Sequence, residues 1–246
     1  MNSHSLMSKP SGFTLIELAV VLFIVMLLLG GLLPTVSSQI EQQRRNETRK
    51  QLDDIQQALY GYASIYGYLP CPVDPAITNP NQANYGEAQN NCNSDAAAEG
   101  ILPWKTLGVS ETDAWGSHRT SSSDPWTGYW KYRVDRNFTL SGTFLTTKLA
   151  TGFVDKLKIA DSNNNALTPS TTGCITPNPT SECPVLIVYS TGPNRTADGN
   201  NATYEANAAA NPLYQSDTPS PAYDDILIWL SRPQIFNRMM SAGKLP

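Results

Sequence analysis

The apolar residues of the chain gather first in one long N-terminal run. From Leu18 to Leu33 every residue is apolar or glycine, and together with Phe13 to Ile16 the run reaches the roughly 20 residues that a membrane-spanning helix needs. One acid, Glu17, interrupts the run and has no basic residue within a helical turn. An ionised carboxylate costs about 2.5 to 3.5 kcal/mol inside a bilayer, so it needs a partner. We predict a transmembrane helix over residues 13–36.

A second, amphipathic helical pattern covers residues 37–68. Pro34 precedes it, and because proline removes an amide donor and clashes one turn back, we expect a bend or local melting there. Apolar residues then recur at spacings of three and four, which predicts a helix with one buried stripe. The stripe is expected to pack on a sheet, with a coiled-coil partner as the alternative. It consists of Leu52, Ile55, Leu59, Tyr62 and Tyr66.

Short strand-like patterns occupy the remaining residues, 69–246. In one of them Trp130, Tyr132 and Val134 alternate with charged residues, which is the period of a half-buried strand. Others are continuous runs rich in valine and isoleucine, typical of covered strands. These patterns predict an α+β fold in which one globular β-domain packs an antiparallel sheet on the long N-terminal helix. The expected strands are residues 129–135, 143–149, 153–159, 185–189 and 226–230.

Four cysteines lie in two polar, proline-containing loops. Three connectivities are open, and we prefer the local pairs Cys71–Cys92 and Cys174–Cys183 because each staples a long loop. A zinc site is the rival interpretation, but the sequence has no Cys-x-x-Cys and only two histidines. Paired cysteines favour an oxidising compartment.

Composition and charge exclude several function classes. The chain has 246 residues, of which 40% are apolar, and a formal net charge of −4. This suits one soluble domain after about the first fifty residues and offers no basic surface for nucleic acid. No serine lies in a Gly-x-Ser-x-Gly motif, and neither His4 nor His118 has a catalytic setting. We therefore expect that the protein is not an enzyme.

The residues Lys9-Pro10-Ser11-Gly12 followed by Phe13-Thr14-Leu15-Ile16-Glu17-Leu18 resemble the signal of type IV pilins and of the pseudopilins of type II secretion. In that family a prepilin peptidase cuts after the glycine and methylates the new amine. The resemblance implies cleavage between Gly12 and Phe13, with residues 1–12 as the leader. It also implies that Glu17 pairs with the N-terminal amine of a neighbouring subunit; pairing within its own chain is the alternative.

The resemblance also decides the expected topology. Counting basic residues would place the domain in the cytoplasm, because Lys9 stands almost alone before the span whereas four bases follow it between residues 44 and 50. Acids interleave with these four bases, as on a solvated helix face. We follow the resemblance and expect a single-pass protein of the inner membrane with a periplasmic C-terminal domain.

Two further segments resemble the major pseudopilins. One is the turn Asp113-Ala114-Trp115-Gly116. The other is the loop that begins at Ser190-Thr191-Gly192 and ends before the last strand; in those relatives it holds a calcium ion. Calcium takes six to eight oxygen ligands, whereas Asp and Asn are also ordinary turn residues. The candidate calcium ligands here are Asp198, Asn200, Asp224 and Asp225.

These observations predict a structural subunit, major or minor, of a type IV pilus or a type II secretion pseudopilus. Its expected partners are copies of itself or other pilins, the prepilin peptidase and the inner-membrane assembly platform; calcium is the one candidate cofactor. The alternative is a membrane-anchored periplasmic binding or adhesion domain that does not polymerise. Filament incorporation should require Glu17, whereas a simple anchor should tolerate Glu17→Leu.

Overall fold

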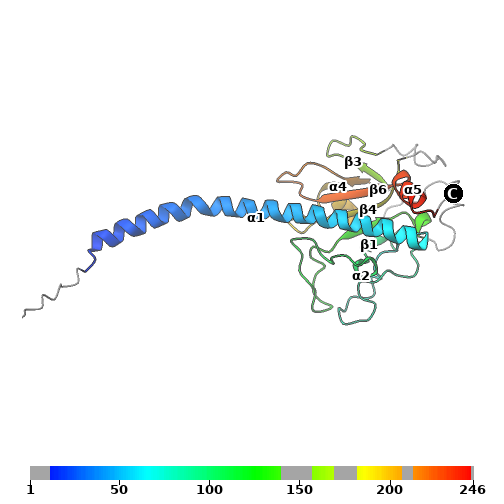
Figure 1. The fold of residues 1–246 in the computed structure, drawn as a ribbon, viewed down its shortest axis with the longest axis horizontal. Helices are drawn as coiled ribbons and strands as arrows, with labels where there is room; N and C mark the ends of the chain where they lie inside the picture. The colour runs from blue at the N-terminus through cyan, green and yellow to red at the C-terminus, as the bar shows by residue number, and fades with distance from the viewer. Residues whose placement is uncertain (1–11, 140–156, 169–181, 207–212, 245–246) are drawn as a thin grey trace, which may run out of the picture. The chain divides into compact units, whose positions relative to one another are not determined.

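The computed structural model describes residues 12–139, 157–168, 182–206 and 213–244 (Figure 1). It divides into two compact units, Met1–Gln43 and Arg44–Pro246. The second unit contains all the β-strands that the structure describes.

The first helix, α1 (Leu15–Tyr66), is continuous. The local melting expected near Pro34 is therefore wrong: one missing amide removes a single hydrogen bond, and the turns on either side keep theirs. The helix ends before Gly67, which has a φ of 77° and donates its amide to the carbonyl of Ala63. Within the part of the chain that the structure describes, no helix combines the length and hydropathy that crossing a bilayer requires.

The C-terminal part of α1 forms one wall of the main core. Leu52, Ile55 and Leu59 are buried as the stripe predicts, and Ala63 joins them. Tyr66 departs from the prediction because it is 55% exposed. The stripe leaves the core one turn before the helix ends.

The main sheet has four strands in the order β1-β2-β4-β6, and every neighbouring pair is antiparallel (Figure 1). Together with α1 it confirms the predicted α+β, pilin-like arrangement. The predicted strands 129–135, 185–189 and 226–230 are present with small changes of length. The bounds are β1 Glu99–Ile101, β2 Lys131–Val134, β4 Pro184–Ser190 and β6 Ile226–Ser231.

A second, two-stranded sheet covers the other face of β4. Its strands, β3 (Lys158–Ala160) and β5 (Leu213–Gln215), pair in parallel with each other and form a sheet of their own. Ile187 and Tyr189 of β4 pack against it, and all seven residues of β4 are buried. Of the predicted strand 153–159, the last two residues lie in β3. Residues 153–156 and the whole predicted strand 143–149 lie outside the described residues.

Short α-helices that the sequence analysis did not predict are α2 (Trp104–Leu107), α4 (Gly199–Ala206) and α5 (Arg232–Ser241). A single turn of 3-10 helix covers Arg136–Phe138. The last helix, α5, follows β6 directly (Figure 1). It buries Ile235, Phe236 and Met239. The sequence did contain its signal, a capping box formed by Ser231 and Gln234.

The long polar loop after α1 is stapled as expected. Cys71 and Cys92 form a disulfide across 5.8 Å between their Cα atoms. Cys183 is also disulfide-bonded, and Cys174, its expected partner, lies outside the described residues. The loop also contributes Val73 and Tyr85 to a second, smaller core with Trp104 and Tyr129, against which Ile101 of β1 packs.

A buried arginine organises the next part of this region. Arg119 is 2% exposed and stacks 3.9 Å over the ring of Trp126. Each of the three guanidinium nitrogens donates a hydrogen bond to a backbone carbonyl, those of Thr78, Asp124 and Ser122. The loops of this region are therefore held together by the hydrogen bonds and the stacking of one buried side chain.

Candidate functional site

The N-terminus of α1 carries a capping arrangement. Thr14 precedes the first helical residue, and its Oγ1 accepts a hydrogen bond from the backbone amide of Glu17 at 3.3 Å. The sequence Thr-x-x-Glu is that of a capping box, in which the N-cap hydroxyl satisfies an otherwise unpaired amide of the first turn. Glu17 also lies in the first turn, where a negative charge favours the positive end of the helix dipole. This position gives Glu17 a role within its own chain that the sequence analysis did not identify.

The two residues at the expected cleavage site have no evident packing role. A Cβ added at Gly12 would meet no atom within 4 Å, and the backbone there has no positive φ. Phe13 is 84% exposed. The fold therefore gives no reason for a glycine followed by an aromatic residue at this point.

The first part of α1 exposes large apolar side chains on all its faces. A helix that is apolar all round requires apolar surroundings, which a single solvated helix does not provide. Each of these side chains is at least 42% exposed. They are Phe13, Leu15, Ile16, Leu18 and every residue from Val20 to Leu28.

Three carboxylates meet in the loop between β4 and β6. Asp198 stands just before α4, and Asp224 and Asp225 stand just before β6. One carboxylate oxygen from each lies within 4.8 Å of the others. Asp198 accepts hydrogen bonds from Asn194 Nδ2 at 3.0 Å and from the amide of Asp224 at 2.8 Å. The structure thus brings together three of the four predicted calcium ligands.

The two neighbouring asparagines, Asn200 and Asn201, contact different groups. Asn200 donates its backbone amide to Gln215 Oε1 at 3.2 Å. Asn201 is fully buried and donates its Nδ2 to Asp225 Oδ2 at 2.9 Å. Asn201, like Asn194, was not selected from the sequence, because nothing in a polar loop distinguishes the asparagine that turns inward.

Asp225 is the most buried of the three acids, at 3% exposed. Burial raises the pKa of Asp225 to about 7, against the lowering effect of the hydrogen bonds from the amide of Asp198 and from Asn201. Its second oxygen, Oδ1, is buried and accepts no hydrogen bond from the described residues. A buried acceptor without a donor is costly, so this position favours either a proton or a cation.

The arrangement fits a hard cation. Calcium binds carboxylate and carbonyl oxygens, and charge from three acids matches a divalent ion. The buried Oδ1 of Asp225 supplies a ligand atom that no other described group uses. The cluster is therefore a candidate calcium site by its donor set and by its unsatisfied oxygen.

A glycine lets the start of the loop approach the cluster. Gly192 has a φ of 63°, a conformation that side chains other than glycine rarely adopt. A Cβ there would collide with Asp224 Oδ1 and lie 2.6 Å from the Asp224 carbonyl oxygen. The Ser-x-Gly part of the loop is thus fixed by close packing against an acid of the cluster.

A hydrogen bond joins the turn at Asp113 directly to Ser190, where the loop begins. Ser190 Oγ donates to Asp113 Oδ2 at 2.5 Å and accepts from the amide of Gly192 at 3.0 Å. Asp113 Oδ1 accepts from the amide of Trp115 at 2.9 Å. Burial raises the pKa of Asp113, whereas the Ser190 hydrogen bond lowers it. The Asp-x-Trp-Gly turn therefore supports the carboxylate loop through one hydroxyl.

Comparison with known families gives one match. Residues 7–33 match the model of the prokaryotic N-terminal methylation motif. Comparisons with curated protein sequences and with solved structures found no significant match.

Proposed function

We propose that this chain, whose N-terminal methylation motif is typical of type IV pilins and type II pseudopilins, is a structural subunit of one of these filaments. The motif is the observation that carries the proposal. The pilin-like arrangement of a long helix and an antiparallel sheet supports it. The protein then works by assembly, not by catalysis.

The prepilin-type motif implies anchoring in the inner membrane, with the globular domain in the periplasm before assembly. The exposed apolar side chains of residues 13–28 support this, since a bilayer first and neighbouring helices later would cover them. Cleavage between Gly12 and Phe13 explains a glycine that the fold itself does not require. The partners are the prepilin peptidase, the assembly platform and other subunits.

Glu17 is proposed to pair with the methylated amine of a neighbouring subunit. Both groups lie in apolar surroundings, where an unpaired charge is costly, so each gains by meeting the other. Pairing of this kind would set the axial register between subunits.

The carboxylate cluster is proposed to hold calcium through Asp198, Asp224 and Asp225. When bound, the ion supplies positive charge to three acids that otherwise repel one another. The chain's own hydrogen bonds, from Asn194 and Asn201, orient the carboxylates beforehand. The consequence would be a fixed β4–β6 loop on the subunit surface.

The experiment that tests this function is intact-mass analysis of the protein from its native membranes, compared with a strain that lacks the prepilin peptidase. A product that begins at methylated Phe13, absent from the deficient strain, is the expected result. A chain that still begins before Gly12 in both strains would refute the filament proposal.

The position of Glu17 in the first turn of α1, where a negative charge favours the helix dipole, favours a second candidate, an anchored domain that does not polymerise, because it explains the acid without a partner subunit. Two variants separate the candidates. Glu17→Gln keeps a residue suited to a capping box but removes the charge, whereas Thr14→Ala removes the cap and keeps the charge. If charge pairing drives assembly, filaments are lost in Glu17→Gln and retained in Thr14→Ala. Filaments that survive Glu17→Gln would contradict the pairing.

A further inference from the structure

The buried side chain of Asn201 joins the carboxylate cluster to the second sheet. Asn201 lies in the first turn of α4, and its Nδ2 donates to Asp225 Oδ2 at 2.9 Å. The same nitrogen donates to the carbonyl oxygen of Gln215, in β5, at 3.1 Å. The Oδ1 of Asn201 accepts the backbone amide of Gln215 at 2.8 Å. An asparagine amide has two N–H donors, so one serves the cluster and the other serves β5.

For Gln215, the amide of Asn201 takes the place of a neighbouring strand. β5 pairs with β3 on one side, where Ser216 donates its amide to the carbonyl of Ala160. Backbone groups of successive residues point to opposite sides of a strand, so those of Gln215 point away from β3. Gln215 is buried, and a buried backbone group without a partner is costly. The pairing of β5 on this side therefore depends on Asn201 and on Tyr223, whose hydroxyl donates to the Gln215 carbonyl at 2.6 Å.

The start of α4 also holds the side chain of Gln215. Its Oε1 accepts the backbone amide of Asn200 at 3.2 Å. Gly199 has a φ of 52°, and a Cβ there would lie 2.1 Å from Gln215 Oε1, so only glycine fits this approach. Asp198 directly precedes Gly199 in the chain. The cluster, the start of α4 and β5 are thus one contiguous polar network.

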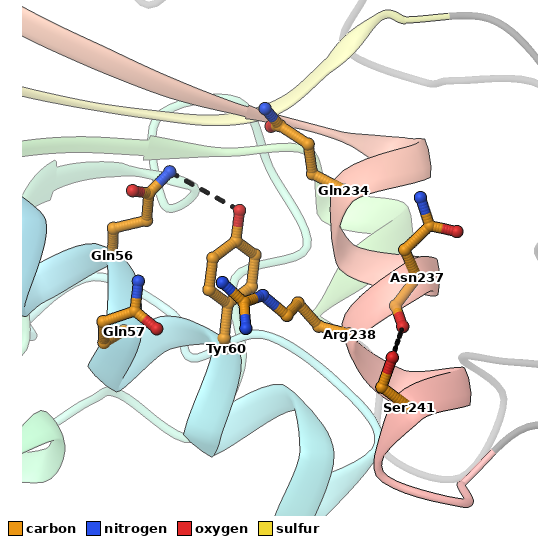
Figure 2. Close-up of a pocket in the computed structure, with 7 residues that line it drawn as sticks. All are labelled: Gln56, Gln57, Tyr60, Gln234, Asn237, Arg238 and Ser241. Carbon is orange, nitrogen blue, oxygen red and sulfur yellow. Dashed lines mark hydrogen bonds between the residues drawn. The ribbon is translucent and has the colours of Figure 1, made fainter.

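The polar groove between α1 and α5 differs from this network. Figure 2 shows that its hydrogen bonds are local: Gln56 donates to Tyr60 Oη, and Ser241 donates to the carbonyl of Asn237, each within one helix. Asn237 and Ser241 are exposed, and water can replace such bonds at little cost. Asn201 is fully buried, and its partners come from separate elements. Its loss would leave buried groups of those elements without their donor.

We propose that Asn201 is a positioning residue of the cation site and that it couples occupation of this site to the pairing of β5. The inference rests on the proposed calcium site and adds its link to the second sheet. Asn201 holds Asp225 Oδ2, which leaves Asp225 Oδ1 available to a cation. Asn200, the asparagine that the sequence predicts as a ligand, joins the network through its backbone amide, and its side chain forms no hydrogen bond with any described residue.

Thermodynamic coupling of this kind is reciprocal. If the release of β5 from Asn201 weakens calcium binding by some factor, calcium suppresses that release by the same factor. The hydrogen bond from Asn201 to the ionised Asp225 involves a charge, and the lower end of the range for such bonds corresponds to about a tenfold change in affinity. Calcium should therefore suppress the release of β5 about tenfold.

The test is hydrogen exchange of the full chain in detergent, with EDTA or with saturating calcium, read at the amide of Gln215 by mass spectrometry with peptide fragmentation. In the wild type, calcium should slow this exchange about tenfold, because the amide exchanges only when it leaves Asn201. The amides of Thr120 and Ser121 are the internal control. They donate to Asp124 and not to the cluster, so calcium should leave their exchange unchanged.

Variants separate the coupling from simple packing. Asp225→Asn keeps an oxygen for Asn201 but removes the charged ligand, so calcium should no longer affect the exchange of Gln215. Asn201→Ala should weaken calcium binding about tenfold, measured by isothermal titration, and should also abolish the calcium effect on Gln215. Asn200→Ala is the matched change at the neighbouring asparagine and should resemble the wild type in both measurements. The wild type and Asp225→Asn decide the question even if Asn201→Ala does not fold.

The outcomes distinguish the coupling from the functions on which it rests. If calcium binds the wild type but leaves the exchange of Gln215 unchanged, the coupling is overturned and the calcium site stands. If calcium still slows this exchange in Asn201→Ala, the link runs through another residue and the proposal is again overturned. If the wild type binds no calcium, the calcium site and the coupling both fail, whereas the filament proposal is unaffected because the N-terminal motif carries it.

Discussion

Replacing Asp225 by asparagine tests whether the ionised, buried carboxylate lowers the stability of the folded chain when no cation is bound. The pKa of Asp225 is raised by burial to about 7, whereas an unfolded aspartate titrates near 4. The folded chain therefore binds the proton more tightly than the unfolded chain. The contribution of this group to stability is fully present below about pH 4, declines as the pH rises, and is lost above about pH 7.

The magnitude follows from the two pKa values. Each pH unit between them corresponds to about 1.4 kcal/mol, so the ionised, cation-free form costs up to about 4 kcal/mol at pH 8. Asparagine keeps an oxygen for the amide of Asp198 and for Asn201 and places an N–H₂ where Oδ1 lacks a donor. With calcium removed, the variant should therefore be more stable than the wild type at pH 8 and similar to it at pH 4.

Calcium should reverse this order. At a hundredfold excess over its dissociation constant, a ligand that binds only the folded state stabilises it by about 2.7 kcal/mol. The wild type should gain this stability and the Asp225→Asn variant should gain little.

The assay is denaturant unfolding of the full chain in detergent at pH 4, 6 and 8, with EDTA or with calcium. Asp54→Asn, the same change at an exposed helix position, is the control and should match the wild type in every condition. A wild type in EDTA whose stability does not fall between pH 4 and pH 8 relative to the variant would refute the burial argument. Equal stabilisation of both chains by calcium would show that the ion binds elsewhere.

Two further sets of substitutions test the packing around this site and the staple of the first loop. Gly192→Ala should destabilise the domain by about 1 to 3 kcal/mol and weaken its calcium response, because the positive φ of Gly192 and its contact with Asp224 exclude a Cβ. Urea unfolding measures this loss of stability. An unchanged free energy of unfolding would contradict the close packing. Gly61→Ala is its control within α1, where a Cβ meets nothing, and should stabilise by up to about 1 kcal/mol. Replacing both Cys71 and Cys92 by alanine opens a loop of 21-residue separation and should cost about 3 kcal/mol in the same assay, whereas an unchanged midpoint would show that the loop is held by its other contacts.

Sequence reasoning found the strands in which the pattern of apolar residues reflects the faces that other elements cover. Trp130, Tyr132 and Val134 alternate because one face of β2 meets the main core, and the unbroken apolar run of β4 reflects cover on both faces. The alternation did not reveal that Arg133, on the other face of β2, is buried as well. The signal at Glu17 was equally visible because its spacing from Phe13 is local. Periodicity reports an element's surroundings when the element is long enough to show a period.

The elements that were missed depend on tertiary context. Strand β1 is three residues long and exists because Glu99 to Ile101 pair with β2, which no local pattern encodes. The inward turn of Asn201 is likewise fixed by partners far along the chain. By contrast, α5 could have been found, since the capping box at Ser231 is a local signal that the preceding strand pattern obscured.

The burial of α1 within the globular domain has a mechanical consequence. Thr48 of α1 is fully buried and accepts a hydrogen bond from the amide of Ala114 at 3.3 Å, and the apolar stripe beyond it ends at Leu59 and Ala63 in the centre of the core. A close-packed interior transmits strain instead of absorbing it. Tension along this helix would therefore load the whole domain at once, and the helix could be withdrawn only by breaking the core that it shares with the main sheet.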